Sequence, residues 1–157
     1  MKIRLLAAAV TLTAAGAHAG PASLQRSPAI APDSLSGTVI KCWTTPGGSS
    51  GSATDYCVPS VPASGYAVNI QVYAPAGGTY SYAWTVPALP PPFGAKQSIF
   101  SGCISTTSYC NLAVGSAGSD LDNTIFVTVT DTATSETLPL EATYWIPAVC
   151  GGGSSWC

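Results

Sequence analysis

The sequence has 157 residues, six cysteines and only 8% charged side chains, and seven acids against five bases give a formal net charge of −2. This length fits a single domain. The 16 glycines and 13 prolines are typical of a secreted all-β domain with many turns. The acidic balance argues against a nucleic-acid or anionic-membrane partner.

Residues 1–19 have the three parts of a secretory signal peptide. Two basic residues precede the apolar run Leu5 to Ala15, and Ala17-His18-Ala19 is an A-x-A cleavage site. The apolar run is shorter than the roughly 20 residues that a membrane-spanning helix needs, and no later stretch approaches that length. We therefore expect a secreted or periplasmic protein without a membrane span.

Cleavage after Ala19 changes the chemistry available to the chain. It removes His18, the sole histidine, and leaves three bases against seven acids, so the net charge changes from −2 to −4. Without histidine, the mature chain has no imidazole base for a Ser or Cys nucleophile and no histidine ligand for zinc. We expect no cofactor, no metal ion and no enzymatic activity.

Residues 20–36 are rich in Pro, Ala and Ser and predict a flexible leader, and residues 37–149 predict the folded domain. Within this domain, apolar residues alternate with polar or small ones in several segments. A period of two marks strands that are buried on one face. The predicted strands are Thr38 to Thr44, Tyr66 to Tyr73, Tyr80 to Val86, Gln97 to Ile104, Ser108 to Val114, Thr124 to Thr130 and Thr137 to Ile146.

The segment Tyr80 to Val86 shows the most regular alternation, and it carries Trp84. We expect Trp84 to be almost fully buried between two sheets, because a tryptophan side chain can bury more apolar area than any other. Its expected neighbours are Tyr66, Val68, Ile70, Ile125, Val127, Val129 and Leu140. Pro139 lacks a backbone donor, so we expect the last strand at a sheet edge.

The segments Tyr82-Ala83-Trp84 and Phe126 to Asp131, the latter followed by a turn and a terminal strand, resemble a bacterial immunoglobulin-like domain of the broad class that includes PKD-type modules. The resemblance covers about Gly37 to Ala148. It implies an antiparallel, immunoglobulin-like β-sandwich of about seven strands and a role in adhesion, spacing or recognition. The sequence lacks the inter-sheet disulfide of antibody domains and a tyrosine corner near Ile125.

Six cysteines in an exported chain predict up to three disulfides, and 15 pairings are possible. Sequential pairing is favoured by equal C-x6-C spacings in the second half and by a flexible loop between the first two cysteines. The alternative joins Cys42 to Cys150, because first and last strands of such sandwiches often lie side by side. The six residues are Cys42, Cys57, Cys103, Cys110, Cys150 and Cys157.

The carboxylates raise two further hypotheses, a calcium site and a pair of catalytic acids. Asp120 and Asp122 could provide oxygen ligands for calcium, but carboxylates in turns more often cap backbone donors, and no complete calcium loop is present. Asp55, Glu136 and Glu141 lack any pattern that would pair two acids for hydrolysis.

Three aromatic residues are candidate binding residues: Trp43 beside the first cysteine, Phe93 after three prolines, and Trp156 in residues 150–157, which predict a disulfide-closed tail loop that displays it. The alternative for each is a packing role against the core. These features favour a secreted, non-enzymatic recognition, adhesion or structural module whose partner is an extracellular or envelope protein or glycan. The alternatives are an inhibitor of a secreted hydrolase and a histidine-free hydrolase that uses carboxylates.

Overall fold

The computed structural model describes residues 34–47 and 55–157, and it is an all-β sandwich, as the sequence predicts. The predicted signal peptide and most of the predicted leader lie outside the described residues. Within the described residues, seven strands have six residues or more, which confirms the predicted number of about seven. They are β1 (Val39–Thr45), β3 (Gly65–Tyr73), β4 (Tyr80–Thr85), β5 (Gln97–Gly102), β6 (Tyr109–Gly115), β7 (Leu121–Asp131) and β8 (Thr137–Ile146).

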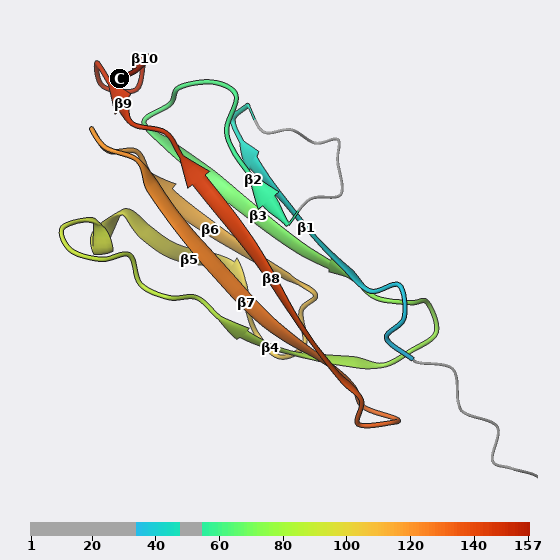
Figure 1. Cartoon of the computed structure of the whole chain (residues 1–157). Coiled ribbons are helices and arrows are strands. Elements are labelled where there is room, and N and C mark those ends of the chain that lie inside the picture. The colour runs from blue at the N-terminus through green and yellow to red at the C-terminus, as the bar shows by residue number, and fades with distance from the viewer. Residues whose placement is uncertain (1–33, 48–54) are drawn as a thin grey trace, which may run out of the picture. The chain divides into compact units, whose positions relative to one another are not determined.

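Two four-stranded sheets form the layers of the sandwich (Figure 1). The first has the order β1-β3-β6-β5, and the second has the order β2-β8-β7-β4, where β2 is the two-residue strand Tyr56–Cys57. The long strands pair antiparallel, whereas β2 pairs parallel with β8. The 3-10 turn η1 (Phe93–Lys96) follows the three prolines and leads into β5. Two short strands, β9 (Val149–Cys150) and β10 (Ser155–Trp156), pair in the tail.

The alternation that predicts the strands also forms the core. In β3 every second residue is buried, from Tyr66 to Val72, and in β7 and β8 the same period buries Val127 and Tyr144. Because both sheets turn these faces toward each other, the inner residues exclude water and stabilise the domain. The largest fully buried side chain is Tyr144, which is 0% exposed.

The prediction for Trp84 is wrong in its central point, because this side chain is only half-buried. It faces the core, where it is packed against buried residues, but among the strands of the described residues β4 pairs only with β7 and forms the edge of its sheet. One flank of an edge strand has no neighbouring strand to cover its side chains. The Trp84 indole Nε1 instead donates a hydrogen bond of 3.0 Å to the Thr107 carbonyl.

The structure has the sequential disulfide pairing and not the Cys42–Cys150 alternative. Cys42 on β1 is joined to Cys57 on β2, so this buried bridge links the two sheets, but through strands other than those of antibody domains. Cys103–Cys110 closes the loop between β5 and β6, and Cys150–Cys157 closes the tail. The Ser105 carbonyl in the β5–β6 loop accepts a hydrogen bond from the Tyr82 amide, which joins this loop to β4.

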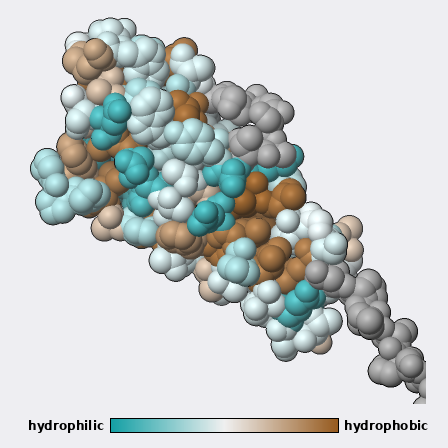
Figure 2. Space-filling model, viewed as in Figure 1, coloured by the Kyte–Doolittle hydropathy of each residue, from teal (hydrophilic) through white to brown (hydrophobic). Residues whose placement is uncertain are grey.

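Pro139 occupies a partly unpaired stretch of β8. It lies opposite Thr128 of β7, while β2 pairs with β8 only at Thr143 and Tyr144. The edge predicted from Pro139 is therefore present in this half of β8, although β8 lies between two strands in the sheet order. Figure 2 shows apolar side chains gathering between β8 and β1. Leu138 and Leu140 of β8 are half-buried and pack against the core.

A polar cluster connects the sheets at the opposite edge. Gln97, the first residue of β5, accepts hydrogen bonds at Oε1 from the Tyr144 hydroxyl and from Asn123 Nδ2, the latter at 2.9 Å. Its Nε2 donates to the Pro87 carbonyl at 2.8 Å, and Asn123 donates to the same carbonyl at 2.7 Å. Buried polar groups are stable only when they are hydrogen-bonded, and Gln97 meets this need for Tyr144.

Candidate functional site

The outer face of the sheet β1-β3-β6-β5 carries aromatic and amide side chains in neighbouring rows. Trp43 on β1, Asn69 on β3 and Asn111 on β6 point outward, between the inward residues of their strands. The register places these three residues side by side. One row further along, Gln71 lies between Lys41 and Tyr109. We call this surface the amide face; it consists of Lys41, Trp43, Asn69, Gln71, Tyr73, Tyr109 and Asn111 together with the groove described next.

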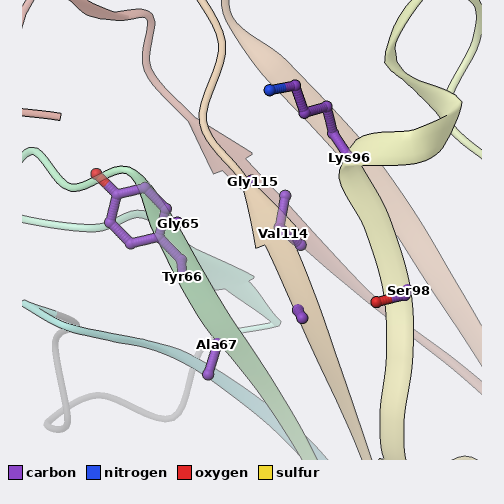
Figure 3. Close-up of a pocket in the computed structure, with 8 residues that line it drawn as sticks. Gly65, Tyr66, Ala67, Lys96, Ser98, Val114 and Gly115 are labelled. Carbon is purple, nitrogen blue, oxygen red and sulfur yellow. The ribbon is translucent and has the colours of Figure 1, made fainter. Parts of the chain in front are cut away.

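An open groove of about 470 Å³ extends this face toward the start of β3. Its floor consists of small residues on the outward positions of adjacent strands, because Gly65 pairs with Gly115 and Ala67 with Ala113. Figure 3 shows Lys96 and Ser98 along one side of the groove, with β6 and β3 beyond them. The lining residues are Gly65, Tyr66, Ala67, Lys96, Ser98, Ala113, Val114 and Gly115.

The absence of a side chain at Gly115 leaves room for Lys96. A Cβ built on Gly115 would lie 3.2 Å from the Lys96 Cδ, so the lysine stem lies directly over this glycine. The ammonium group extends beyond it, and no carboxylate of the described residues pairs with it. Lysine commonly packs its methylene stem on a surface while its charge stays in water. A larger residue at position 115 would displace the stem.

Hydrogen bonds hold the polar side chains of the amide face in place. Asn111 Nδ2 donates to the Ser101 hydroxyl at 2.9 Å, and Gln71 Nε2 donates to the Ser108 hydroxyl at 2.7 Å. These bonds use the amide nitrogens and leave amide oxygens as acceptors. Tyr73 and Tyr109 are 47% and 38% exposed, so their rings are available on the same surface.

A close approach of backbone and ring fixes Tyr109. Gly102 has a φ of 72°, and a Cβ there would lie 2.5 Å from the Tyr109 ring. Only glycine combines this left-handed conformation with the required space. The Cys103–Cys110 disulfide closes the same turn, so the position of Tyr109 is set by two independent constraints.

Charge is unevenly distributed over the two sheets. Both lysines of the described residues, Lys41 and Lys96, lie on the amide face or at its groove. The Lys41 ammonium lies 4.9 Å from the centre of the Tyr73 ring, where a cation–π contact holds it. All six described carboxylates lie in the other sheet or in the segments next to its strands: Asp55, Asp120, Asp122, Asp131, Glu136 and Glu141.

These carboxylates are dispersed, and several have structural roles. The Asp120 carboxylate accepts a hydrogen bond of 2.8 Å from the Ala148 amide. Asp131 accepts from the amides of Ala133 and Thr134 in the β7–β8 turn, and the first of these bonds is the main reason why its pKa is lowered. Among the residues that the structure describes, no group of three or more His, Cys, Asp or Glu side chains could hold a metal ion.

The tail forms a small disulfide-closed ring, as predicted. Cys150 and Cys157 are joined, and the paired strands β9 and β10 bring the two ends of the ring together. Gly153 packs against the backbone of Ser64, the residue before groove residue Gly65. Trp156 is 38% exposed. The ring therefore lies next to the loop that precedes β3, and Trp156 is exposed on the ring.

The three predicted binding residues occupy different surroundings. Trp43 is half-buried on the amide face, with its neighbours Cys42 and Thr44 directed inward. Phe93 is half-buried at the start of η1 and packs against the core, which corresponds to its predicted alternative role. Trp156 lies in the tail ring. The structure does not gather these three aromatics into one cluster.

Several residues of the site were missed by sequence analysis. Ala67 and Ala113 lie in predicted strands and Gly65 and Gly115 directly outside them, and their common surface was missed because it depends on which strands pair. Tyr66 was predicted only as a core residue, yet its hydroxyl accepts a 2.7 Å bond from the Ala63 amide and donates a 2.9 Å bond to the Val61 carbonyl. These bonds fold the loop before β3 onto its own tyrosine, as a tyrosine corner does.

Comparisons with protein-family models, with curated proteins and with solved structures find no match for this chain. The resemblance to immunoglobulin-like and PKD-type domains therefore stays a prediction, while the disulfide-linked β-sandwich is established from the structure itself. In the described part of the chain, no helix has the length and apolar character needed to cross a membrane.

Proposed function

We propose that this protein is an exported, non-enzymatic recognition module that binds an extracellular or envelope macromolecule through the amide face. The observation that carries the proposal is the composition of this surface: two exposed tyrosines, a tryptophan and three amides continue the sheet face beyond an open groove, and the surface contains no carboxylate. Aromatic residues with a few oriented polar groups are typical of ligand-binding surfaces. The predicted signal peptide and the three disulfides support an oxidising compartment outside the cytoplasm.

The dispersion of acidic groups supports binding over hydrolysis. A carboxylate mechanism would need two acids that converge on one substrate. Asp131 and Glu136 are instead occupied in the β7–β8 turn, where Glu136 Oε2 accepts bonds from the Ser34 amide and hydroxyl. The groove itself is lined by one lysine, one serine, one tyrosine and five small or aliphatic residues.

The tail ring favours a second candidate, an inhibitor of a secreted hydrolase. A disulfide-closed loop with an exposed aromatic is pre-organised for insertion into another protein's active site. Secreted hydrolases assayed with and without the purified protein test this candidate. Inhibition that is lost in Trp156→Ala would favour the inhibitor, and unchanged hydrolysis would exclude it for the enzymes tested.

The main proposal is tested by retention of envelope and culture-supernatant fractions on the immobilised protein. Trp43→Ala and Tyr109→Ala should each reduce retention of the bound component, because both remove aromatic surface from the amide face. Phe126→Ala is the matched control, since Phe126 is 43% exposed on the outer side of the opposite sheet. Equal retention by all three variants and the unaltered protein would contradict the proposal.

A further inference from the structure

The charge and shape of the amide face indicate the class of its ligand, an inference that rests on the proposed function. We propose that this face binds an extended oligosaccharide that carries carboxylate groups. Lys41 and Lys96 supply the positive charge, the aromatic rings supply stacking surface, and the amides supply hydrogen bonds.

Charge complementarity is the first support for an acidic ligand. The net charge of the mature chain is negative, yet the amide face contains both lysines, and none of the carboxylates, of the described residues. The negative side chains lie on the other sheet or in the segments next to its strands, so the potential of the domain is polarised between its two faces. An anionic chain would be attracted to the lysine side and repelled by Asp122 and Glu141 on the opposite one.

The uncharged centre of the face is the second support, because it distinguishes a sugar acid from a polyphosphate. Between the two lysines lie Asn69, Asn111 and the serines of β5, and these groups pair with hydroxyls as donors and acceptors. A sugar ring has apolar C–H faces and a rim of hydroxyls, which match exposed tyrosine rings and neighbouring amides. A nucleic acid would require a much denser array of cations.

The geometry is the third support, because it favours an extended ligand. Lys41 lies opposite Gln71, whereas Lys96 lies over Gly115 opposite Gly65, so the two rows are six residues apart along β3. At strand spacing this separation is about 20 Å. A ligand that reaches both ammonium groups must therefore be a chain of several rings, laid over the small-residue floor of the groove.

Isothermal titration with short oligomers of α-1,4-linked galacturonate, and with the same oligomers as neutral methyl esters, tests the proposal on the disulfide-bonded protein. The esters keep the ring and its hydroxyls but remove the charge. We expect the acid to bind about tenfold more tightly than the ester at low salt, because hydrogen bonds to a charged partner are the stronger ones. This preference should disappear near molar salt.

Variants identify the residues responsible. Lys96→Gln should reduce the preference for the acid and the double variant Lys41→Gln/Lys96→Gln should abolish it, whereas Lys96→Arg should preserve it and Glu141→Gln on the opposite sheet should leave it unchanged. Tyr109→Ala should weaken acid and ester alike. Equal binding of acid and ester, no binding of either, or an unchanged preference in Lys96→Gln would overturn the acidic-oligosaccharide proposal. Retention of an envelope component that depends on Trp43 and Tyr109 would still support recognition by this face.

Discussion

Replacing Gln97 by alanine should destabilise the domain well beyond the loss of one surface side chain. Gln97 provides the hydrogen-bond acceptor for the Tyr144 hydroxyl, and Tyr144 is 0% exposed. A buried hydroxyl left without a partner costs about 1–3 kcal/mol, and the lost hydrogen bonds to Asn123 and Pro87 add about 1 kcal/mol. We expect Gln97→Ala to reduce the free energy of unfolding by about 2–4 kcal/mol.

The companion variant Tyr144→Phe separates the hydrogen bond from packing. It removes the hydroxyl but keeps the ring, and Gln97 Oε1 retains its bond from Asn123 Nδ2 at 2.9 Å. Its expected cost is therefore only about 0.5–1.5 kcal/mol. In the double variant no orphaned hydroxyl remains, so the combined cost should fall below the sum of the single costs by about 1–2 kcal/mol.

Urea denaturation of the four proteins, followed by tryptophan fluorescence, measures these free energies. The pH dependence gives a second readout, because burial raises the pKa of Tyr144, which strengthens proton binding in the folded state. The protonated Tyr144 hydroxyl contributes fully to the free energy of unfolding below the ordinary tyrosine pKa of about 10, and this contribution is lost as the pH rises further. Tyr144→Phe has no hydroxyl to titrate, so it should lack this alkaline loss of stability. Additive costs, within about 0.5 kcal/mol, would refute the proposed connection between the sheets.

Three further predictions concern stability. Trp84→Ala should cost about 2 kcal/mol in urea denaturation, below the 3–5 kcal/mol of a fully buried tryptophan, and a loss above about 4 kcal/mol would contradict its edge position. Trp156→Ala should change stability by at most about 0.5 kcal/mol, whereas a loss of 2 kcal/mol would show that the ring depends on it. Because the pKa of Asp131 is lowered, this carboxylate stabilises the fold above the ordinary carboxyl pKa of about 4, and the stabilisation is lost as pH falls toward the lowered value. Asp131→Asn should therefore flatten the acidic limb of a plot of unfolding free energy against pH, and an unchanged limb would contradict this role.

The strands could be predicted well because alternation is a local property. The predicted last strand, Thr137 to Ile146, has the bounds observed for β8, and the other six long strands differ by a few residues at their ends. The inward side chains of β3 and β8 could be assigned from the same pattern, and so could Ile125, Val127 and Val129 of β7, but not the buried Leu121 and Asp131 at the ends of β7. Cysteine spacing also favoured the sequential pairing that the structure contains.

The position of each strand within its sheet could not be predicted, because it depends on pairing between distant segments. The alternation around Trp84 shows which face is apolar but not whether one or two strands flank it. The structure places this segment at an edge and gives the fully buried aromatic position to Tyr144. The amide face was hidden for the same reason, because Asn69, Asn111 and Trp43 come together only through the register of three strands.

The central claim is that the outer face of β1-β3-β6-β5 is the binding surface. The most direct test is an NMR titration of the isotopically labelled protein with galacturonate oligomers, in which backbone amide shifts are mapped residue by residue. We expect the largest changes at Gly65, Ala67, Ser98, Ala113 and Gly115, around the groove, and little change at Phe126 or Glu141. Changes confined to the outer face of β7 and β8, or to the tail ring, would contradict the account.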